Sequence, residues 1–311
     1  MDNELHKVIL DTDIGDDIDD SLALLLLLNS KDKFNLLGVT TVFRNSYKRA
    51  KMAKQLISAM ESDVEVYAGE DFPFKTDPDH LDREKILAKE KVDETGKYLF
   101  PQWSESMREF PVNEQGAVDF IIEQVHKYPY EVTIICIGPL TNIARAIKKD
   151  PSIVPLLKGL RIMGGGYELD RPEWNVYCDP EATSIVYSSG IADIHAIGCD
   201  ITSRTWLSQN DIDLLKNSTA KPIHLVYHAM KKWFTYYEYV RPVMHDPLTV
   251  VSLIDPTVVT FKEMHMDVNL EDKRGYTFVN PNCQNIVNVA VDVNKEKFFK
   301  IFKGTLGLEE A

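Results

Sequence analysis

Short runs of β-branched and aliphatic residues alternate along most of the chain with segments in which apolar positions recur at helical spacing. The strand-like runs are Val8–Leu10, Leu36–Val42, Val64–Tyr67, Val132–Ile137, Leu160–Met163 and Ile194–Ile197. The helix-like segments include Leu22–Leu28, Tyr47–Met60, Val118–His126, Thr141–Ile147 and Pro180–Tyr187. This alternation predicts the α/β class, with an open, mostly parallel, twisted sheet that carries helices on both faces.

Three further stretches depart from the alternation. Residues 71–112 are rich in charge and proline and have no clean period, which indicates an insertion or a lid. Residues 223–240 have a helical pattern crowded with aromatic side chains, and residues 268–293 have the pattern of β segments ahead of a short amphipathic tail at 295–302. We therefore expect one α/β domain over residues 1–311, with a small additional β region near the C-terminus.

Composition narrows the choice of partner. The chain has 311 residues, 44% of them apolar, which is enough to bury a sizeable core. Its 48 acidic and 35 basic residues give a formal charge of −13, which disfavours nucleic acid and anionic membranes as partners. No signal-peptide pattern and no apolar run of about 18 residues is present. We expect a cytoplasmic protein that acts on a small molecule, with four widely spaced cysteines as core thiols.

The most unusual local feature is an acidic segment that places six aspartates within ten positions, from Asp11 to Asp20. It lies between the first strand-like run and the leucine-rich Leu22–Leu28. Carboxylates crowded without a partner repel one another, and burial raises their pKa values until some become neutral. A hard divalent cation with oxygen ligands removes that conflict, so the segment predicts a metal site. Asp11 and Asp13 carry the prediction best, because they close a strand at the sheet edge where α/β proteins bind ligands.

Some aspartates of this segment could have purely structural roles, and two other kinds of site use a similar aspartate spacing. Asp16, Asp17 and Asp19 would equally suit a solvated loop or the first turn of a helix. An EF-hand needs Gly at its sixth position and Glu at its twelfth, but these places hold Asp16 and Leu22, so that site is excluded. A phosphatase of the haloacid dehalogenase type also places Asp-x-Asp after its first strand. Gly15, where that family has Thr or Val, weakens this alternative and leaves it open.

Polar groups follow the other strand-like runs as well. They are Arg44 and Asn45, Gly138–Asn142, Gly164–Gly166 and Asp200. Because the carboxyl ends of parallel strands meet at one edge of a sheet, we expect these groups to converge with the acidic segment on one crevice.

As a set, the motifs resemble those of the inosine-uridine preferring nucleoside hydrolases, in the order of that family and over most of the chain. They are Asp11-Thr12-Asp13 with Asp19-Asp20, Thr40-Thr41-Val42 with Asn45, Gly138-Pro139-Leu140-Thr141-Asn142, Met163-Gly164-Gly165, Glu173-Trp174-Asn175 with Asp179-Pro180-Glu181-Ala182, and His245-Asp246. The resemblance implies a Rossmann-like sheet of the nucleoside hydrolase type. We also expect a homo-oligomer, a dimer or a tetramer.

The resemblance further implies a calcium ion bound by Asp13, Asp20, the backbone carbonyl of Ile137 and Asp246. This ligand set consists of oxygen alone and suits a hard cation. Asp13 would also act as general base for the attacking water at the ion. The first motif of this chain has two more residues between its aspartates than the family pattern, so Asp16 and Asp17 are further candidate ligands.

By the same resemblance, Asn45, Glu173 and Asn175 would bind the sugar hydroxyls, with Met163 beneath the ring. Rupture of a ribosyl N–C bond passes through an oxocarbenium-like state, which nearby carboxylates stabilise. The nucleobase is a poor leaving group, and His245, beside the proposed ligand Asp246, is placed to protonate it.

The segment before His245 supplies candidates for the walls of the base pocket. Tyr237 and Arg241 precede His245 and are candidates for them, although aromatic side chains in such a segment usually pack in the core. The sequence also has Asp93–Lys97 where relatives carry a His-Gly-rich segment, and a shorter stretch between Met163 and Glu173.

The function predicted is calcium-dependent hydrolysis of a ribonucleoside to free base and ribose, in purine or pyrimidine salvage. Three alternatives stay open at this point. They are an N-ribohydrolase of another ribosyl compound, a metal-dependent phosphatase of the haloacid dehalogenase type, and a non-catalytic protein that binds ribose or a nucleoside.

Overall fold

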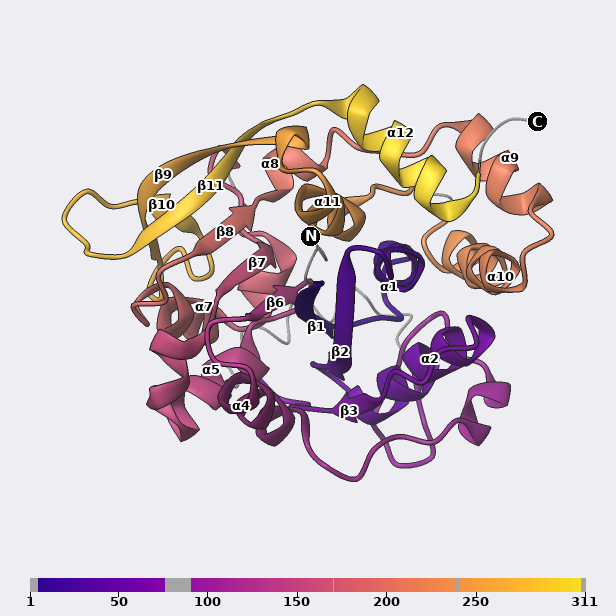
Figure 1. Cartoon of the computed structure of the whole chain (residues 1–311), viewed down its shortest axis with the longest axis horizontal. Helices are drawn as coiled ribbons and strands as arrows, with labels where there is room; N and C mark the ends of the chain where they lie inside the picture. Colours follow the sequence, from indigo (N-terminus) through magenta and orange to yellow (C-terminus); the bar gives the residue numbers. More distant parts are fainter. Residues whose placement is uncertain (1–4, 76–90, 170, 239–240, 309–311) are drawn as a thin grey trace.

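The computed structural model describes residues 5–75, 91–169, 171–238 and 241–308. Its centre is a nine-stranded sheet in the order β10-β9-β11-β8-β7-β6-β1-β2-β3 (Figure 1). The strands are β1 (His6–Thr12), β2 (Phe34–Thr41), β3 (Val66–Ala68), β6 (Val132–Cys136), β7 (Gly159–Met163), β8 (Ile194–Ile197), β9 (Val259–Val268), β10 (Thr277–Val279) and β11 (Ile286–Val293). Within this sheet, parallel pairing runs from β3 through β1 to β11, whereas β9 pairs antiparallel with both β11 and β10. The predicted open, mostly parallel sheet is confirmed, and the additional β region extends it at one edge.

Helices cover both faces of this sheet (Figure 1). One layer contains α1 (Asp19–Asn29), α2 (Ser46–Ala59), α9 (Gln209–Asn217), α10 (Lys221–Tyr236), α11 (His245–Ile254) and α12 (Lys295–Leu306). The other contains α4 (Ala117–Lys127), α5 (Thr141–Lys149) and α7 (Pro180–Tyr187). The short helices α6 (Trp174–Cys178) and α8 (Cys199–Thr202) follow β7 and β8, and three 3₁₀ turns lie at Glu105–Glu109, Pro151–Leu156 and Pro256–Val258.

The central strands are buried on both faces, which explains their nearly continuous apolar runs. In β1, Val8 and Leu10 belong to the core beneath α1, whereas Ile9 points to the core beneath α4 and α5. Helix α1 is apolar on all sides for a related reason, because it contacts α2, α11 and α12 while lying over the sheet, and its leucines are all buried. The acidic segment is thereby joined to a helix whose residues are nearly all buried.

The strand order places a crevice beside the acidic segment. The chain leaves β1 toward β2 and β3 on one side and returns through β6 on the other, so the order reverses between β1 and β6. Open α/β sheets bind ligands at such a reversal, outside the carboxyl ends of the strands. The backbone N–H of Ile137 donates to the carbonyl of Asp11 at 2.8 Å, which keeps the two strand ends together.

The expected insertion or lid at residues 71–112 falls partly outside the described residues, since 76–90 are not among them. Its described part forms the two-stranded hairpin β4 (Lys91–Val92) and β5 (Tyr98–Leu99), followed by the 3₁₀ turn Glu105–Glu109, which contacts α2. In the described part of the chain, every helix is too short or too polar to cross a lipid bilayer.

Candidate active site

A pocket of about 430 Å³ opens at the carboxyl edge of the sheet, next to the reversal between β1 and β6. The lining comes from the β1–α1 loop with the first turn of α1, the ends of β6 and β7, the segment around α6, the start of α8, the C-terminal half of α10 with the residue after it, and the start of α11. Its lining residues are Asp13, Asp16, Asp17, Asp19, Asp20, Ile137, Met163, Arg171, Glu173, Trp174, Asn175, Cys199, Trp233, Tyr237, His245 and Asp246. Most of the residues proposed from the sequence therefore come together in one cavity.

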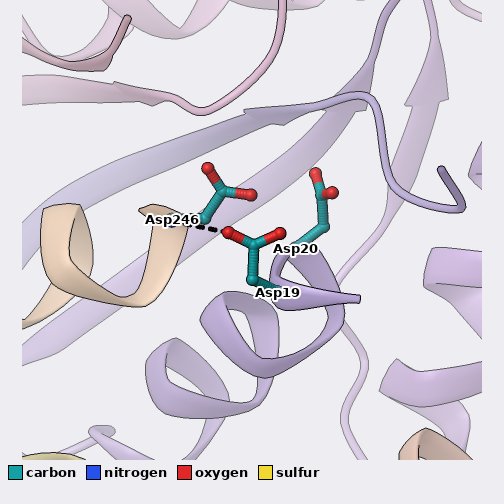
Figure 2. A group of neighbouring side chains, drawn as sticks. All are labelled: Asp19, Asp20 and Asp246. Atoms are coloured by element: carbon teal, nitrogen blue, oxygen red, sulfur yellow. Dashed lines mark hydrogen bonds between the residues drawn. The ribbon is translucent and has the colours of Figure 1, made fainter. Parts of the chain in front are cut away.

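Three buried carboxylates form a compact group on one wall. Asp19 and Asp20 occupy the first turn of α1, and Asp246 occupies the first turn of α11. One ligand oxygen from each lies within 4.8 Å of the others, and Figure 2 shows the three side chains gathered where the two helices begin. The backbone N–H of Asp246 donates to Asp19 Oδ2 at 2.9 Å. Two helix N-termini thus direct their partial positive charge at this group.

Electrostatics show that this wall suits a cation. Burial, followed by repulsion from neighbouring carboxylates, raises the pKa of Asp246 and that of Asp20 well above the usual range. For Asp13, burial raises the pKa, and attraction to Arg49 offsets only part of that rise. Converging buried oxygens of this kind satisfy a hard divalent ion, so these residues could hold a metal. Asp19 is an added candidate ligand, although in sequence it suits a solvated loop or a helix N-terminus equally well.

Asp13 and the Ile137 carbonyl lie in the same pocket but outside the three-carboxylate group. Gly138 lets the end of β6 pass close to the acidic loop, because a Cβ there would lie 2.9 Å from the backbone nitrogen of Asp13. Asp11 is fully buried and does not line the pocket. It accepts hydrogen bonds from Thr40 Oγ1 at 2.6 Å and Asn142 Nδ2 at 2.7 Å, and burial raises its pKa to about 7. Asp11 therefore connects β1 to its neighbours beneath the site.

A second part of the lining is built around Glu173 and Asn175. Glu173 caps α6 by accepting from the backbone N–H groups of Asn175 at 2.8 Å and Val176 at 3.1 Å, and burial raises its pKa. Asn175 Nδ2 donates to the carbonyls of Ile137 at 3.1 Å and Met163 at 3.2 Å. These contacts fix both polar side chains against the ends of β6 and β7, in the pocket that Asp13 and the three carboxylates also line.

His245 begins α11, one residue before the carboxylate of Asp246. Its Nδ1 lies 2.5 Å from Thr202 Oγ1, and no described residue hydrogen-bonds its Nε2. The residue is partly exposed overall, but its ring is surrounded by protein. This loss of solvent, with a smaller effect from Arg171, lowers the pKa of His245 to about 4. The ring is therefore neutral near pH 7 and can donate from one nitrogen while the other meets Thr202.

The remaining wall is aromatic. Trp174, Trp233 and Tyr237 line it, and the rings of Trp233 and Tyr237 lie 5.5 Å apart between centroids. Arg171 is the only Lys or Arg side chain among the described lining residues. Trp233, Trp174, Arg171 and Cys199 were not singled out from the sequence as pocket walls, and the aromatic crowding of residues 223–240 was the available signal for Trp233.

Two sequence-predicted binding residues are not brought to the pocket wall. Asn45 instead donates from Nδ2 to the carbonyl of Tyr98 at 2.8 Å and to Asp93 Oδ2 at 3.0 Å. Arg241 is exposed, with its guanidinium 4.0 Å from the ring centroid of Trp206. Asp16 and Asp17 do line the pocket, although both oxygens of Asp16 accept hydrogen bonds from protein side chains.

Comparison with known proteins gives consistent matches over nearly the whole chain. The family model described as inosine-uridine preferring nucleoside hydrolase matches residues 8–300. Uridine nucleosidase 1 of Arabidopsis thaliana is 35% identical over 270 residues, which cover 83% of this chain and 76% of that protein. The inosine-uridine preferring nucleoside hydrolase of Crithidia fasciculata is 31% identical over 312 residues, 94% of this chain and 95% of that protein. A solved structure, the purine-preferring ribonucleoside hydrolase from Gardnerella vaginalis, has a TM-score of 0.80 at 27% identity, covering 97% of this chain and 98% of that chain.

Proposed function

The chain belongs to the inosine-uridine preferring nucleoside hydrolase family, as its motifs predicted, and is a hydrolase that acts on nucleosides; we propose that it uses calcium to split a ribonucleoside into free base and ribose. The names of its relatives support uridine and inosine as the first substrates to test. The observation that carries the proposal is the group formed by Asp19, Asp20 and Asp246 inside the pocket that also contains Asp13, Glu173 and His245.

Calcium would be held by Asp13, Asp20, Asp246 and the Ile137 carbonyl, with Asp19 as an additional carboxylate in reach of the group. The ligands are oxygens on buried side chains and backbone, which favours a hard cation over the softer transition metals. When bound, such an ion lowers the pKa of water and orients vicinal sugar hydroxyls.

Asp13 would accept the proton of the attacking water. Asp13 lines the pocket together with the three-carboxylate group, so its carboxylate would lie beside a water bound at the ion. Glu173 and Asn175, held in place by their backbone contacts, would hydrogen-bond the ribose hydroxyls, and Met163 would pack under the sugar. The carboxylates of Asp13 and Glu173, which line the same pocket, would also stabilise the positive charge that develops on the ribosyl ring.

The base would leave toward His245 and the aromatic wall. A departing base gains negative charge, and a donor at His245 Nε2 would stabilise it. Trp233 and Tyr237 offer flat apolar faces against which a purine or pyrimidine can stack.

A substrate panel tests this function against the alternatives. Uridine, inosine and cytidine are incubated with the protein and calcium, and the free base is separated by chromatography; 4-nitrophenyl phosphate and another ribosyl compound are run in parallel. Release of base from a nucleoside supports the proposal. Phosphate release alone would favour the phosphatase, although Arg171 as the single Lys or Arg side chain in the described lining argues against it. Binding of nucleosides without turnover would identify a binding protein.

A further inference from the structure

The acidic loop between β1 and α1 is held from behind by Arg49, a fully buried arginine of α2. Its guanidinium donates to the backbone carbonyls of Asp13 and Ile14, the latter at 3.1 Å, and to Asp16 Oδ2 at 2.7 Å. Its Nε donates to the carbonyl of Phe43 at 2.7 Å. One side chain therefore fixes both the backbone of Asp13 and the carboxylate of Asp16.

The hairpin of β4 and β5 also contacts the acidic loop. The hydroxyl of Tyr98 donates to Asp16 Oδ1 at 2.6 Å, so that each oxygen of Asp16 accepts one hydrogen bond. Gln102, just after the hairpin, donates from Nε2 to the carbonyl of Asp17 at 2.5 Å. The hairpin and the segment after it thus contact the loop at two successive acidic residues that line the pocket.

The hairpin is itself fastened to α2 and its N-cap. Lys48 forms a buried ion pair with Asp93 at 2.5 Å, and the N-cap residue Asn45 donates to Asp93 and to the carbonyl of Tyr98. Although burial opposes it, the hydrogen bonds from Lys48 and Thr95 hold the pKa of Asp93 well below its usual range. Asn45, for which the family resemblance implied a sugar contact, instead connects the N-terminus of α2 to the hairpin of β4 and β5 through these hydrogen bonds.

Close packing against Phe100 and attraction to Arg49 also hold the acidic loop in position. Gly15 has φ +122°, and a Cβ at Gly15 would lie 2.4 Å from the ring of Phe100, so the loop backbone rests directly on that ring. The Arg49 guanidinium lies 5.3 Å from the centroid of the same ring. Burial disfavours its charge, but attraction to Asp16 and then to Asp13 outweighs this effect and raises the pKa of Arg49. A buried cation with this many acceptors would be strongly destabilised by the loss of Asp16.

We propose that Arg49 and Tyr98 form with Asp16 a positioning clamp that sets the acidic loop for cation binding and proton acceptance. Asp16 is then a structural partner of Arg49 and Tyr98 and not a metal ligand, whereas Asp13 and Asp17 are presented to the pocket. The clamp also gives the charged hairpin a role, because the hairpin contacts Asp16 through Tyr98 and α2 through Asp93. The part of the inference that concerns the cation rests on the proposed function.

Tyr98→Phe is the most selective test, because it removes one hydroxyl and keeps the ring on which the Arg44 guanidinium stacks at 3.9 Å. Tyr47→Phe is the matched control, since Tyr47 is exposed on α2. With calcium alone as the probe, calorimetry should show a dissociation constant roughly 10-fold higher for Tyr98→Phe and unchanged for the control, the effect of one hydrogen bond to a carboxylate. At saturating calcium, the kcat of Tyr98→Phe for uridine should also fall, because the clamp positions the loop for proton acceptance. The KM for uridine should change little.

Arg49 is tested by comparing two replacements. Arg49→Met removes the charge and the donors, whereas Arg49→Lys keeps the charge and one donor group. The clamp predicts partial recovery of calcium affinity in Arg49→Lys relative to Arg49→Met. Equal losses in both, in step with equal losses of thermal stability, would indicate a purely structural residue and overturn its place in the clamp.

A readout without cation or substrate separates the clamp from the proposed function. Hydrogen–deuterium exchange at residues 13–18, measured in EDTA, should accelerate at least several-fold in Tyr98→Phe and stay unchanged in Tyr47→Phe. Unchanged exchange in Tyr98→Phe overturns the clamp whatever the wild type binds. A wild type that binds no calcium and cleaves no nucleoside would instead overturn the proposed function, and faster loop exchange in Tyr98→Phe would still support the clamp.

Discussion

Asp246→Asn should change stability in opposite directions with and without calcium. The substitution keeps the shape of the side chain and the backbone hydrogen bond to Asp19, and removes one charge from three carboxylates whose ligand atoms lie within 4.8 Å. At that separation, one like-charge pair at an effective dielectric constant near 20 repels by about 3 kcal/mol. The carboxyls relieve part of this by taking up protons, so we expect the apo variant to gain about 1–2 kcal/mol.

Calcium should reverse the order. A ligand at about 1,000 times its dissociation constant stabilises the folded state by about 4 kcal/mol. At about 2–4 °C per kcal/mol for a chain somewhat smaller than this one, the wild type should gain roughly 8–16 °C in Tm. The variant should gain less than half of that, because one ligand charge is missing. The apo variant should melt above the apo wild type by roughly 2–8 °C on the same scale.

The assay is thermal unfolding of wild type and variant in EDTA and in saturating calcium chloride. Asp32→Asn is the matched control, because Asp32 is exposed and its removal changes net charge equally. The control should follow the wild type in both conditions. If Asp246→Asn also melts with the wild type in both, the three carboxylates neither repel one another nor share an ion, and the reasoning fails.

Three further changes test separate parts of the account. Asp13→Ala should nearly abolish uridine hydrolysis, because it removes a proposed ligand and the proposed base together; normal turnover in calcium-replete buffer would assign water activation elsewhere. His245→Ala should slow natural nucleosides by roughly 10²–10⁴-fold but barely affect 4-nitrophenyl riboside, whose leaving group is a stable anion, and equal losses on both substrates would remove His245 from leaving-group chemistry. Gly15→Ala should destabilise the protein by about 1–3 kcal/mol through its contact with Phe100, whereas Gly116→Ala, with no atom within 4 Å of its Cβ, should cost less, because it only weakens the N-cap of α4; equal denaturation midpoints of the two variants would contradict the tight fit at Gly15.

The fold could be predicted from sequence because its signals are local. Strands buried on both faces produce continuous apolar runs such as Val132–Ile137, and the same burial of α1 produces the run Leu22–Leu28. The acidic segment was visible for the same reason, since six aspartates in ten positions next to a buried strand are informative without any tertiary contact.

The hydrogen-bond partners of residues in and around the site depend on tertiary contacts, so they could not be predicted from the sequence. The apparent sugar ligand Asn45 is used by Asp93 and Tyr98, which lie about fifty residues further on. Likewise, Arg49 was indistinguishable in sequence from the other basic residues of a helix with surface-like composition. Only the approach of α2 to the acidic loop reveals it as a buried cation.

Asp19 shows how a local interpretation can obscure a second role. A carboxylate in the first turn of α1 is explained by the helix dipole alone, and so it was weighed as a solvated or capping residue. The arrival of α11 beside that turn brings Asp246 to it and turns a favourable helix start into part of a three-carboxylate group.

The requirement of hydrolysis for calcium is tested most directly by a titration of base release against bound calcium. The protein is stripped with EDTA, calcium is returned in measured steps, and free base from uridine or inosine is followed by chromatography alongside bound metal. We expect negligible base release after stripping. The rate of base release should then recover in proportion to bound calcium and saturate at one ion per chain. Base release that persists in the stripped protein, or calcium that binds without restoring it, would contradict this requirement.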